Sequence, residues 1–137
     1  MSVVRPTDPD AWAVALASVR AARHRSEIVL DEVPAPTRLA PHALALSADI
    51  YDEEGEEIGS GRFVLLHDPD GQEAWDGQFR VVAFAKARLE PEMAADPMLT
   101  EVGWAWLEES LAAHEAGFRS PSGTVTRTAS ECRPSAR

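Results

Sequence analysis

The chain is poor in cysteine. Its single thiol, Cys132, lies in the last six residues. A lone cysteine has no disulfide partner within the chain, and zinc sites built on thiolates use more than one of them. The sequence therefore excludes an intramolecular disulfide and a cysteine-based zinc site.

Long hydrophobic runs are also missing. The longest, at residues 11–17, falls far short of the about 18 apolar residues that span a bilayer. The first ten residues contain two acids and two prolines, whereas a secretory signal has a basic start and an apolar stretch. We therefore expect no membrane span and a cytoplasmic location.

Positive charge is scarce in the middle of the chain. The net charge is −10, and residues 41–100 hold thirteen acids against four bases. Such a segment repels phosphate groups, so nucleic-acid binding is not expected. The one basic cluster, Arg20, Arg23, His24 and Arg25, suits the last turn of a helix, where cations complement the helix dipole. Nucleic-acid binding through the three arginines of this cluster is kept as an alternative function, and such binding would depend steeply on salt concentration.

The rest of the composition is that of a globular protein. The chain has 137 residues, of which 45% are hydrophobic and 26% are charged. A chain of this length buries roughly two-thirds of its unfolded surface. We predict a flexible lead-in at 1–7, a single α+β domain at 8–130 and a disordered tail at 131–137.

Helix signals occur twice. A first helix is predicted to begin at Asp8-Pro9 and to continue to about His24, with Trp12 as its core anchor. A second, longer helix is predicted to begin at Asp96-Pro97 and to end at Gly117. Both starts combine a capping side chain with a proline in the first turn.

Alternation of apolar and polar residues predicts the strands. Four runs stand out at 27–33, 43–51, 58–66 and 78–89, and a short β-rich run follows at 124–128. These elements predict an α+β fold. It has a mainly antiparallel sheet of about four to five strands, an N-terminal helix, and a long helix packed on one face.

The run at 78–89 alternates most cleanly. One face would carry Phe79, Val81, Ala83, Ala85, Ala87 and Leu89, and the other would carry Arg80, Val82, Phe84, Lys86 and Arg88. The small alanines favour close packing of the long helix on their face. In the preceding strand, Gly59 and Gly61 predict a bulge, a bend or the close approach of another backbone.

The segment 67–77 is predicted to be a loop and is the first candidate site. It contains His67, Asp68 and Glu73, which are residue types used as general bases and as hard-metal ligands. Asp-Pro-Asp-Gly and Trp-Asp-Gly are also strong turn sequences, so turn chemistry explains most of the loop without a substrate. No metal site and no cofactor are assigned.

Three further residues are singled out for binding: Trp75, Arg62 and Arg80.

Other catalytic signatures are incomplete. Gly59-Ser60-Gly61 lacks the second spacing of a nucleophile elbow and lies in a predicted strand. The histidines are scattered singly, and each is interpreted as a surface or capping residue: His24, His42, His67 and His114.

Several motifs together point to a known family. They are Gly61-Arg62-Phe63-Val64-Leu65-Leu66-His67-Asp68-Pro69, Gly71-Gln72-Glu73-Ala74-Trp75, Leu89-Glu90-Pro91-Glu92-Met93-Ala94, Asp96-Pro97, Val102-Gly103-Trp104 and Ser122-Gly123-Thr124-Val125-Thr126. In this combination the chain resembles an actinobacterial family of uncharacterised proteins, the domain of unknown function number three thousand, over about residues 10–130. The resemblance implies no substrate, cofactor or catalytic residue. It does imply a further strand and helix, so that the end of this chain would be truncated.

Good core patterning without a convergent catalytic set favours a non-catalytic protein-interaction or regulatory module. We expect it to bind a protein partner, or a second copy of itself, through a face or an edge of the sheet. The alternative is a small hydrolase or a metal-dependent enzyme that uses the 67–77 loop.

Overall fold

The computed structural model describes residues 10–128. Its contacts divide the chain after Arg88 into two compact units, which are described in turn. The predicted lead-in at 1–7 and the tail at 131–137 lie outside the described residues, and the single domain at 8–130 stays a prediction.

The first unit begins with helix α1, Ala11–Ala21. The helix ends earlier than predicted because the backbone of Ala22 is already extended, with φ −63° and ψ 138°. Its predicted start at Asp8-Pro9 lies outside the described residues. Of the basic cluster, only Arg20 therefore lies in the last turn. The expectation that Arg23, His24 and Arg25 also complement the helix dipole from that turn is wrong.

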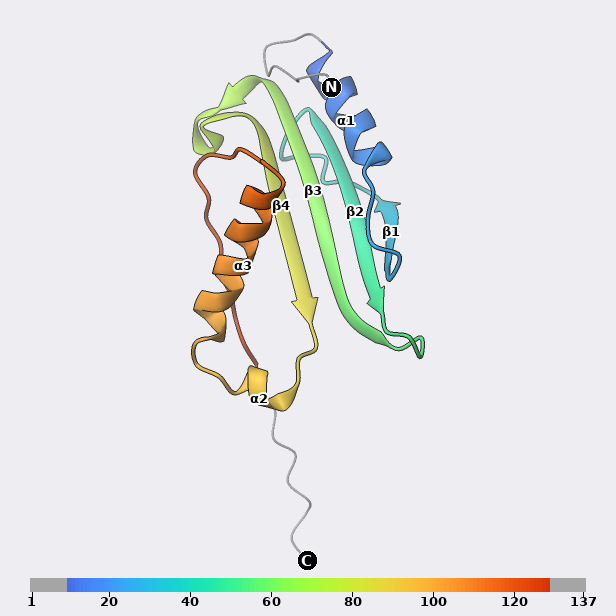
Figure 1. The fold of residues 1–137 in the computed structure, drawn as a ribbon. Coiled ribbons are helices and arrows are strands. Elements are labelled where there is room, and N and C mark those ends of the chain that lie inside the picture. The colour runs from blue at the N-terminus through green and yellow to red at the C-terminus, as the bar shows by residue number, and fades with distance from the viewer. Residues whose placement is uncertain (1–9, 129–137) are drawn as a thin grey trace, which may run out of the picture. The chain divides into compact units, whose positions relative to one another are not determined.

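Four strands follow and form one antiparallel sheet in the order of the sequence. They are β1 (Ile28–Val33), β2 (His42–Tyr51), β3 (Glu57–Gln72) and β4 (Gly77–Ala87). Figure 1 shows them side by side, with β1 and β4 at the two edges. The predicted α+β fold with an antiparallel sheet is thus confirmed.

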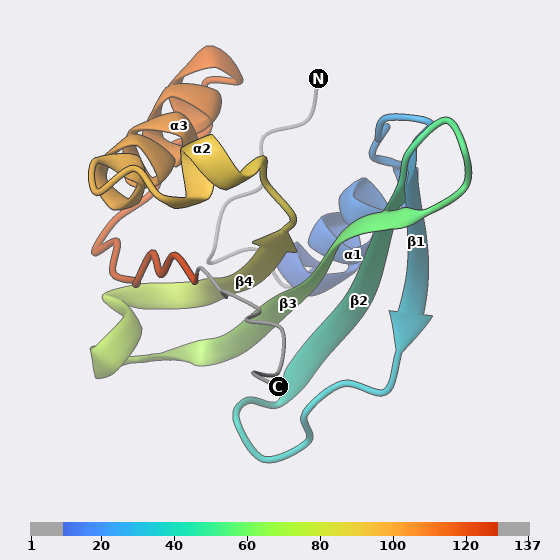
Figure 2. The same ribbon diagram turned by 90° about the horizontal axis from the view of Figure 1, so that it is seen from below.

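The register determines which residues share a face of the sheet. Cross-strand partners point to the same side, so the pairs Leu44↔Leu65 and Leu65↔Val81 place these residues on one face. We call it the α1 face, because Trp12 stacks on it and Arg20 of α1 forms an ion pair with its Glu32. Figure 2 shows α1 lying along this side of the sheet. The opposite side is called the far face.

The core lies at the end of the sheet where β2 begins. Leu44 and Leu65 are buried on the α1 face, and Ala45 and Leu66 are buried on the far face. Toward the other end β3 and β4 approach closely, because a Cβ on Gly61 would lie only 2.8 Å from the Phe84 carbonyl oxygen. Of the three alternatives predicted for Gly59 and Gly61, the close approach of another backbone is the one found at Gly61.

The second unit contains α2 (Pro91–Ala94) and α3 (Leu99–Ala113). The predicted long helix begins later and ends earlier than expected. The segment after α3 packs on it: a Cβ on Gly103 would lie 3.1 Å from a methyl carbon of Val125. The Arg127 guanidinium also donates a hydrogen bond to the Ala94 carbonyl oxygen at 3.1 Å.

The β-rich run at 124–128 forms no strand, so that expectation is wrong. A strand needs a neighbour that satisfies its backbone groups. None of the ladders in the described residues includes this run.

Within residues 10–128, none of the helices has the length and apolar character that crossing a membrane requires.

Candidate functional site

The segment predicted as a loop is mostly strand. Strand β3 continues through His67 to Gln72, and a short 3₁₀ turn at Glu73–Trp75 leads into β4. The turn closes at Asp76, whose φ of 53° is left-handed. Turn chemistry acts at 73–76 and also within the end of β3, where the pairing with β4 is irregular between His67 and Gln72 and Gly71 has a left-handed φ of 74°.

The three residues considered for catalysis have separate surroundings. Asp68 caps the backbone locally, because its Oδ1 accepts from the Asp70 N–H at 3.0 Å. Its Oδ2 accepts from the side-chain Nε2 of Gln72 at 3.2 Å. Glu73 is exposed in the 3₁₀ turn, and His67 is buried. Within residues 10–128, no three histidine, cysteine, aspartate or glutamate side chains gather closely enough to hold a metal ion.

Three neighbouring strands contribute an aromatic row to the α1 face. His42 of β2 is opposite His67 of β3, and His67 is opposite Phe79 of β4. The two imidazoles meet edge to edge, with 3.0 Å between their Nδ1 atoms and 8° between their planes. We call these two residues the histidine pair. The interpretation of both as isolated surface or capping histidines is wrong.

Trp12 of α1 covers the histidine pair. Its ring is nearly parallel to both imidazoles, at centroid distances of 5.5 Å from His42 and 6.0 Å from His67. Phe79 also packs on His67, with 4.4 Å between the ring centroids and 33° between the ring planes. The role of Trp12 as an anchor of the helix agrees with these contacts.

The protonation of the histidine pair is constrained by its geometry. When both rings are neutral, the Nδ1–H group of one ring must donate the hydrogen bond and the Nδ1 lone pair of the other must accept it. Burial, and then the neighbouring His42, lower the pKa of His67 below its ordinary value, although Asp68 acts in the opposite direction. The His67 Nε2 atom is buried and has no hydrogen-bond partner in the described residues. His67 is therefore suited to staying neutral beneath the Trp12 ring of α1.

Sequence reasoning missed the partnership of these histidines. The predicted strand at 43–51 began one residue too late, so His42 was left in the connector. Had the strand included His42, its parity with Leu44 and Leu46 would have placed it on the apolar face. No local signal could have revealed that His67 is its partner.

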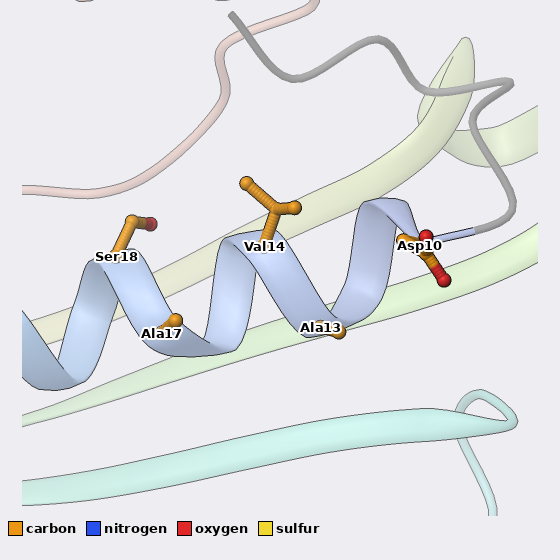
Figure 3. A pocket seen from close by; sticks show the side chains of 5 residues that line it. All are labelled: Asp10, Ala13, Val14, Ala17 and Ser18. Carbon is orange, nitrogen blue, oxygen red and sulfur yellow. The ribbon is translucent and has the colours of Figure 1, made fainter. Parts of the chain in front are cut away.

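A shallow hollow lies along α1. It is lined by side chains along one stripe of the helix (Figure 3): Asp10, Ala13, Val14, Ala17 and Ser18. The Ser18 hydroxyl donates to the Ala15 carbonyl oxygen at 2.8 Å. The hollow therefore offers few polar groups that could bind a ligand.

The far face carries an exposed patch on β3 and β4. The register places the even-numbered residues of β4 on this face, as the alternation predicted, with Arg62 of β3 opposite Phe84. We call the following five residues the β4 patch: Arg62, Arg80, Val82, Phe84 and Lys86. Val82 is 43% exposed and Phe84 is 62% exposed.

The cations of the β4 patch are free of ion pairs with the described residues. The described residues form two ion pairs, Arg20–Glu32 and Arg25–Glu27, and both lie outside the patch. Arg62 and Arg80, predicted as binding residues, thus share one exposed face. The third, Trp75, is half-buried in the 3₁₀ turn.

These features define a class of protein: an α+β protein built on a four-stranded antiparallel meander with helices at both ends of the sequence. The chain belongs to the family described as Protein of unknown function (DUF3000), whose model matches residues 8–133. Comparison with curated proteins finds no match. Comparison with solved structures finds none either.

Proposed function

We propose that this protein is a non-catalytic protein-interaction or regulatory module that binds a protein partner through the β4 patch. The observation that carries the proposal is the row Arg80, Val82, Phe84 and Lys86, in which two apolar side chains lie between two cations on one exposed strand face. Exposed apolar side chains rimmed by charge are typical of binding surfaces.

The charge distribution of the chain supports this role for the patch. The net charge is −10, yet three of the four bases in residues 41–100 belong to the β4 patch. Exposed cations gathered on an acidic protein attract an acidic partner and orient its approach. A cytoplasmic location is also proposed, because the sequence has a single cysteine and structural disulfides are typical of secreted proteins.

A binding role fits the described geometry better than catalysis by the 67–77 segment does. His67 faces α1 from inside a strand, whereas Asp68 is engaged in local backbone capping and Glu73 is exposed. A general base must lie within hydrogen-bond reach of the group that it serves. These three side chains share no such point, because they do not form one cluster.

The test compares two double charge reversals of the full chain. Arg80→Glu with Lys86→Glu alters the patch, and Arg38→Glu with Arg119→Glu changes the net charge equally at exposed positions elsewhere. Each protein is used to capture partners from a lysate of the source cells. Any captured protein is then purified, and its affinity for the three chains is measured in a two-component assay.

The expected result is a binary complex that the wild type and the control reversal form equally. The patch reversal should weaken it at least about ten-fold, since two charge contacts become repulsive. Equal affinity for all three chains would show that the β4 patch is not the binding surface. Turnover of a substrate that depends on His67 would contradict the non-catalytic role.

A further inference from the structure

We infer that the partner is an extended acidic segment that adds to the free edge of β4 as a fifth strand. This inference rests on the proposed function and names the kind of partner that the β4 patch fits. Within residues 10–88, β4 pairs with β3 on one side only, so its other side is an edge of the sheet. An edge strand offers unpaired backbone groups to an incoming strand.

The length and the conformation of this edge suit strand addition. Strand β4 has 11 residues and β1 has 6, so β4 offers the longer ladder. Neither proline nor a bulge interrupts the stretch from Phe79 to Ala87, which pairs continuously with β3. An incoming strand could therefore hydrogen-bond along this whole stretch.

The side chains on the far face dictate the sequence of the incoming strand. Residues directly opposite each other in neighbouring strands interact most strongly, and opposite charges there are favourable. Arg80 and Lys86 call for acidic residues at the two ends of a seven-residue window. Val82 and Phe84 call for apolar residues at the two positions between. The partner pattern is therefore acid, apolar, apolar, acid at every second residue.

A second copy of the chain fits this edge poorly. Antiparallel pairing of two β4 strands about Ala83 would place Arg80 of each copy opposite Lys86 of the other, and like charges directly opposite are destabilising. Pairing of β4 with the β1 edge of another copy would offer a single acid on the far face, Asp31. Charge complementarity thus favours a different, acidic protein.

The experiment uses synthetic peptides and the full chain. The test peptide has about ten residues, with glutamates opposite Arg80 and Lys86 and valines at the two positions between. One comparison peptide carries lysines in place of the glutamates, and a second is scrambled. A third comparison peptide has N-methyl groups on every second backbone amide, which blocks one of its two edges. It is prepared in two versions that block opposite edges, so that one of them cannot form the hydrogen bonds to β4.

Affinities are measured by fluorescence anisotropy, and amide hydrogen exchange reports on β4. The wild type should bind the glutamate peptide at least about ten-fold more tightly than the Arg80→Glu, Lys86→Glu variant does. The lysine peptide should show the reverse preference. One N-methylated version should lose binding, and binding of the unmodified peptide should slow exchange along β4. The Arg38→Glu, Arg119→Glu variant should behave as the wild type.

The outcomes separate this inference from the proposed function. Binding that survives both N-methylated versions, or that the scrambled peptide matches, would overturn strand addition while leaving the β4 patch as an interaction surface. Absence of peptide binding would also overturn it, even when a captured partner still depends on Arg80 and Lys86. If the captured partner too is indifferent to the reversal, the proposed function fails as well. Patch-dependent binding of a single-stranded oligonucleotide, or a patch-dependent dimer in sedimentation, would replace the acidic segment with a nucleic acid or a second copy.

Discussion

The Nδ1 atoms of His42 and His67 lie 3.0 Å apart beneath the ring of Trp12. The two imidazoles come from neighbouring strands, and the indole comes from α1. One hydrogen-bonded pair thus connects β2 with β3 and provides the surface on which the helix rests. The contact has consequences for stability that can be measured.

The first prediction concerns the pH dependence of folding. The pKa of His67 in the folded state is lowered by burial, and also by His42, relative to the ordinary value of 6.5. Below pH 6.5 an unfolded chain therefore takes up a proton that the folded chain resists. The free energy of unfolding should be at its full value above this pH and should fall as the pH drops through 6.5 toward the lower folded pKa.

Urea unfolding at pH 7.5 and at pH 5.5 measures this effect. His67→Gln removes the titrating ring and should shrink the difference between the two conditions. His114→Gln, which removes a histidine outside this cluster, is the matched control and should preserve the difference. A wild type that is equally stable at both pH values would contradict the role given to His67.

The second prediction concerns Trp12. Replacement by alanine removes the ring that covers the histidine pair, and truncation of large aromatic side chains costs about 3–5 kcal/mol when they are fully buried. Because Trp12 is half-buried, we expect a loss of about 2–3 kcal/mol. Trp12→Phe keeps a stacking ring and should retain most of the stability.

Chemical denaturation followed by circular dichroism gives these values. Trp106→Ala in α3 is the control, because Trp106 is 48% exposed and its truncation should cost less. A Trp12→Ala variant as stable as the wild type would show that α1 docks without this stack.

A third prediction follows from the close approach of β3 and β4. In Gly61→Ala the new Cβ would lie 2.8 Å from the Phe84 carbonyl oxygen, a backbone atom that cannot move without shifting β4. We expect the variant to lose about 1–3 kcal/mol, as overpacked sites do. Gly117→Ala adds a methyl group where no heavy atom lies within 4 Å, so its midpoint of denaturation should match that of the wild type.

The fourth prediction concerns the turn into β4. Asp76 has a φ of 53°, a left-handed conformation that costs most residues about 1–2 kcal/mol and glycine almost nothing. Asp76→Gly should therefore leave stability unchanged or raise it by up to about 1 kcal/mol, whereas Asp76→Val should lower it by about 1–2 kcal/mol. Thermal melts of the two variants and the wild type decide the matter, and equal melting temperatures for Gly and Val would refute the account.

Much of the fold was predictable because its signals are local. Alternation over residues 78–89 predicted both β4 and the residues that share its far face, and the register confirms that arrangement. The close spacing of Gly59 and Gly61 likewise predicted a bulge, a bend or the approach of another backbone, and Gly61 shows the last of these. Both features depend on side-chain alternation and Cβ sterics, which can be read along the chain.

The candidate sites were predictable in unequal measure. Arg62 and Arg80 share an exposed face because strand parity and the pairing Arg62↔Phe84 together align them. The density of turn residues in the 67–77 segment predicts a loop, whereas strand β3 runs to Gln72 with an irregularity in its pairing to β4 after His67 and a left-handed Gly71. The turn residues thus shape a bulge-like stretch within a strand, and turn propensity alone does not tell such a stretch from a loop.

The sequence by itself determined the class of fold, the period of each strand and the acidic charge against which the cations of β4 stand out. Only the tertiary structure decided which histidines meet, because His42 and His67 lie 25 positions apart and their partnership depends on strand register. Register and helix docking are set by packing between distant segments, which no local pattern encodes. For the same reason the run at 124–128 has strand-like residues but no strand, since no strand within residues 10–128 pairs with it.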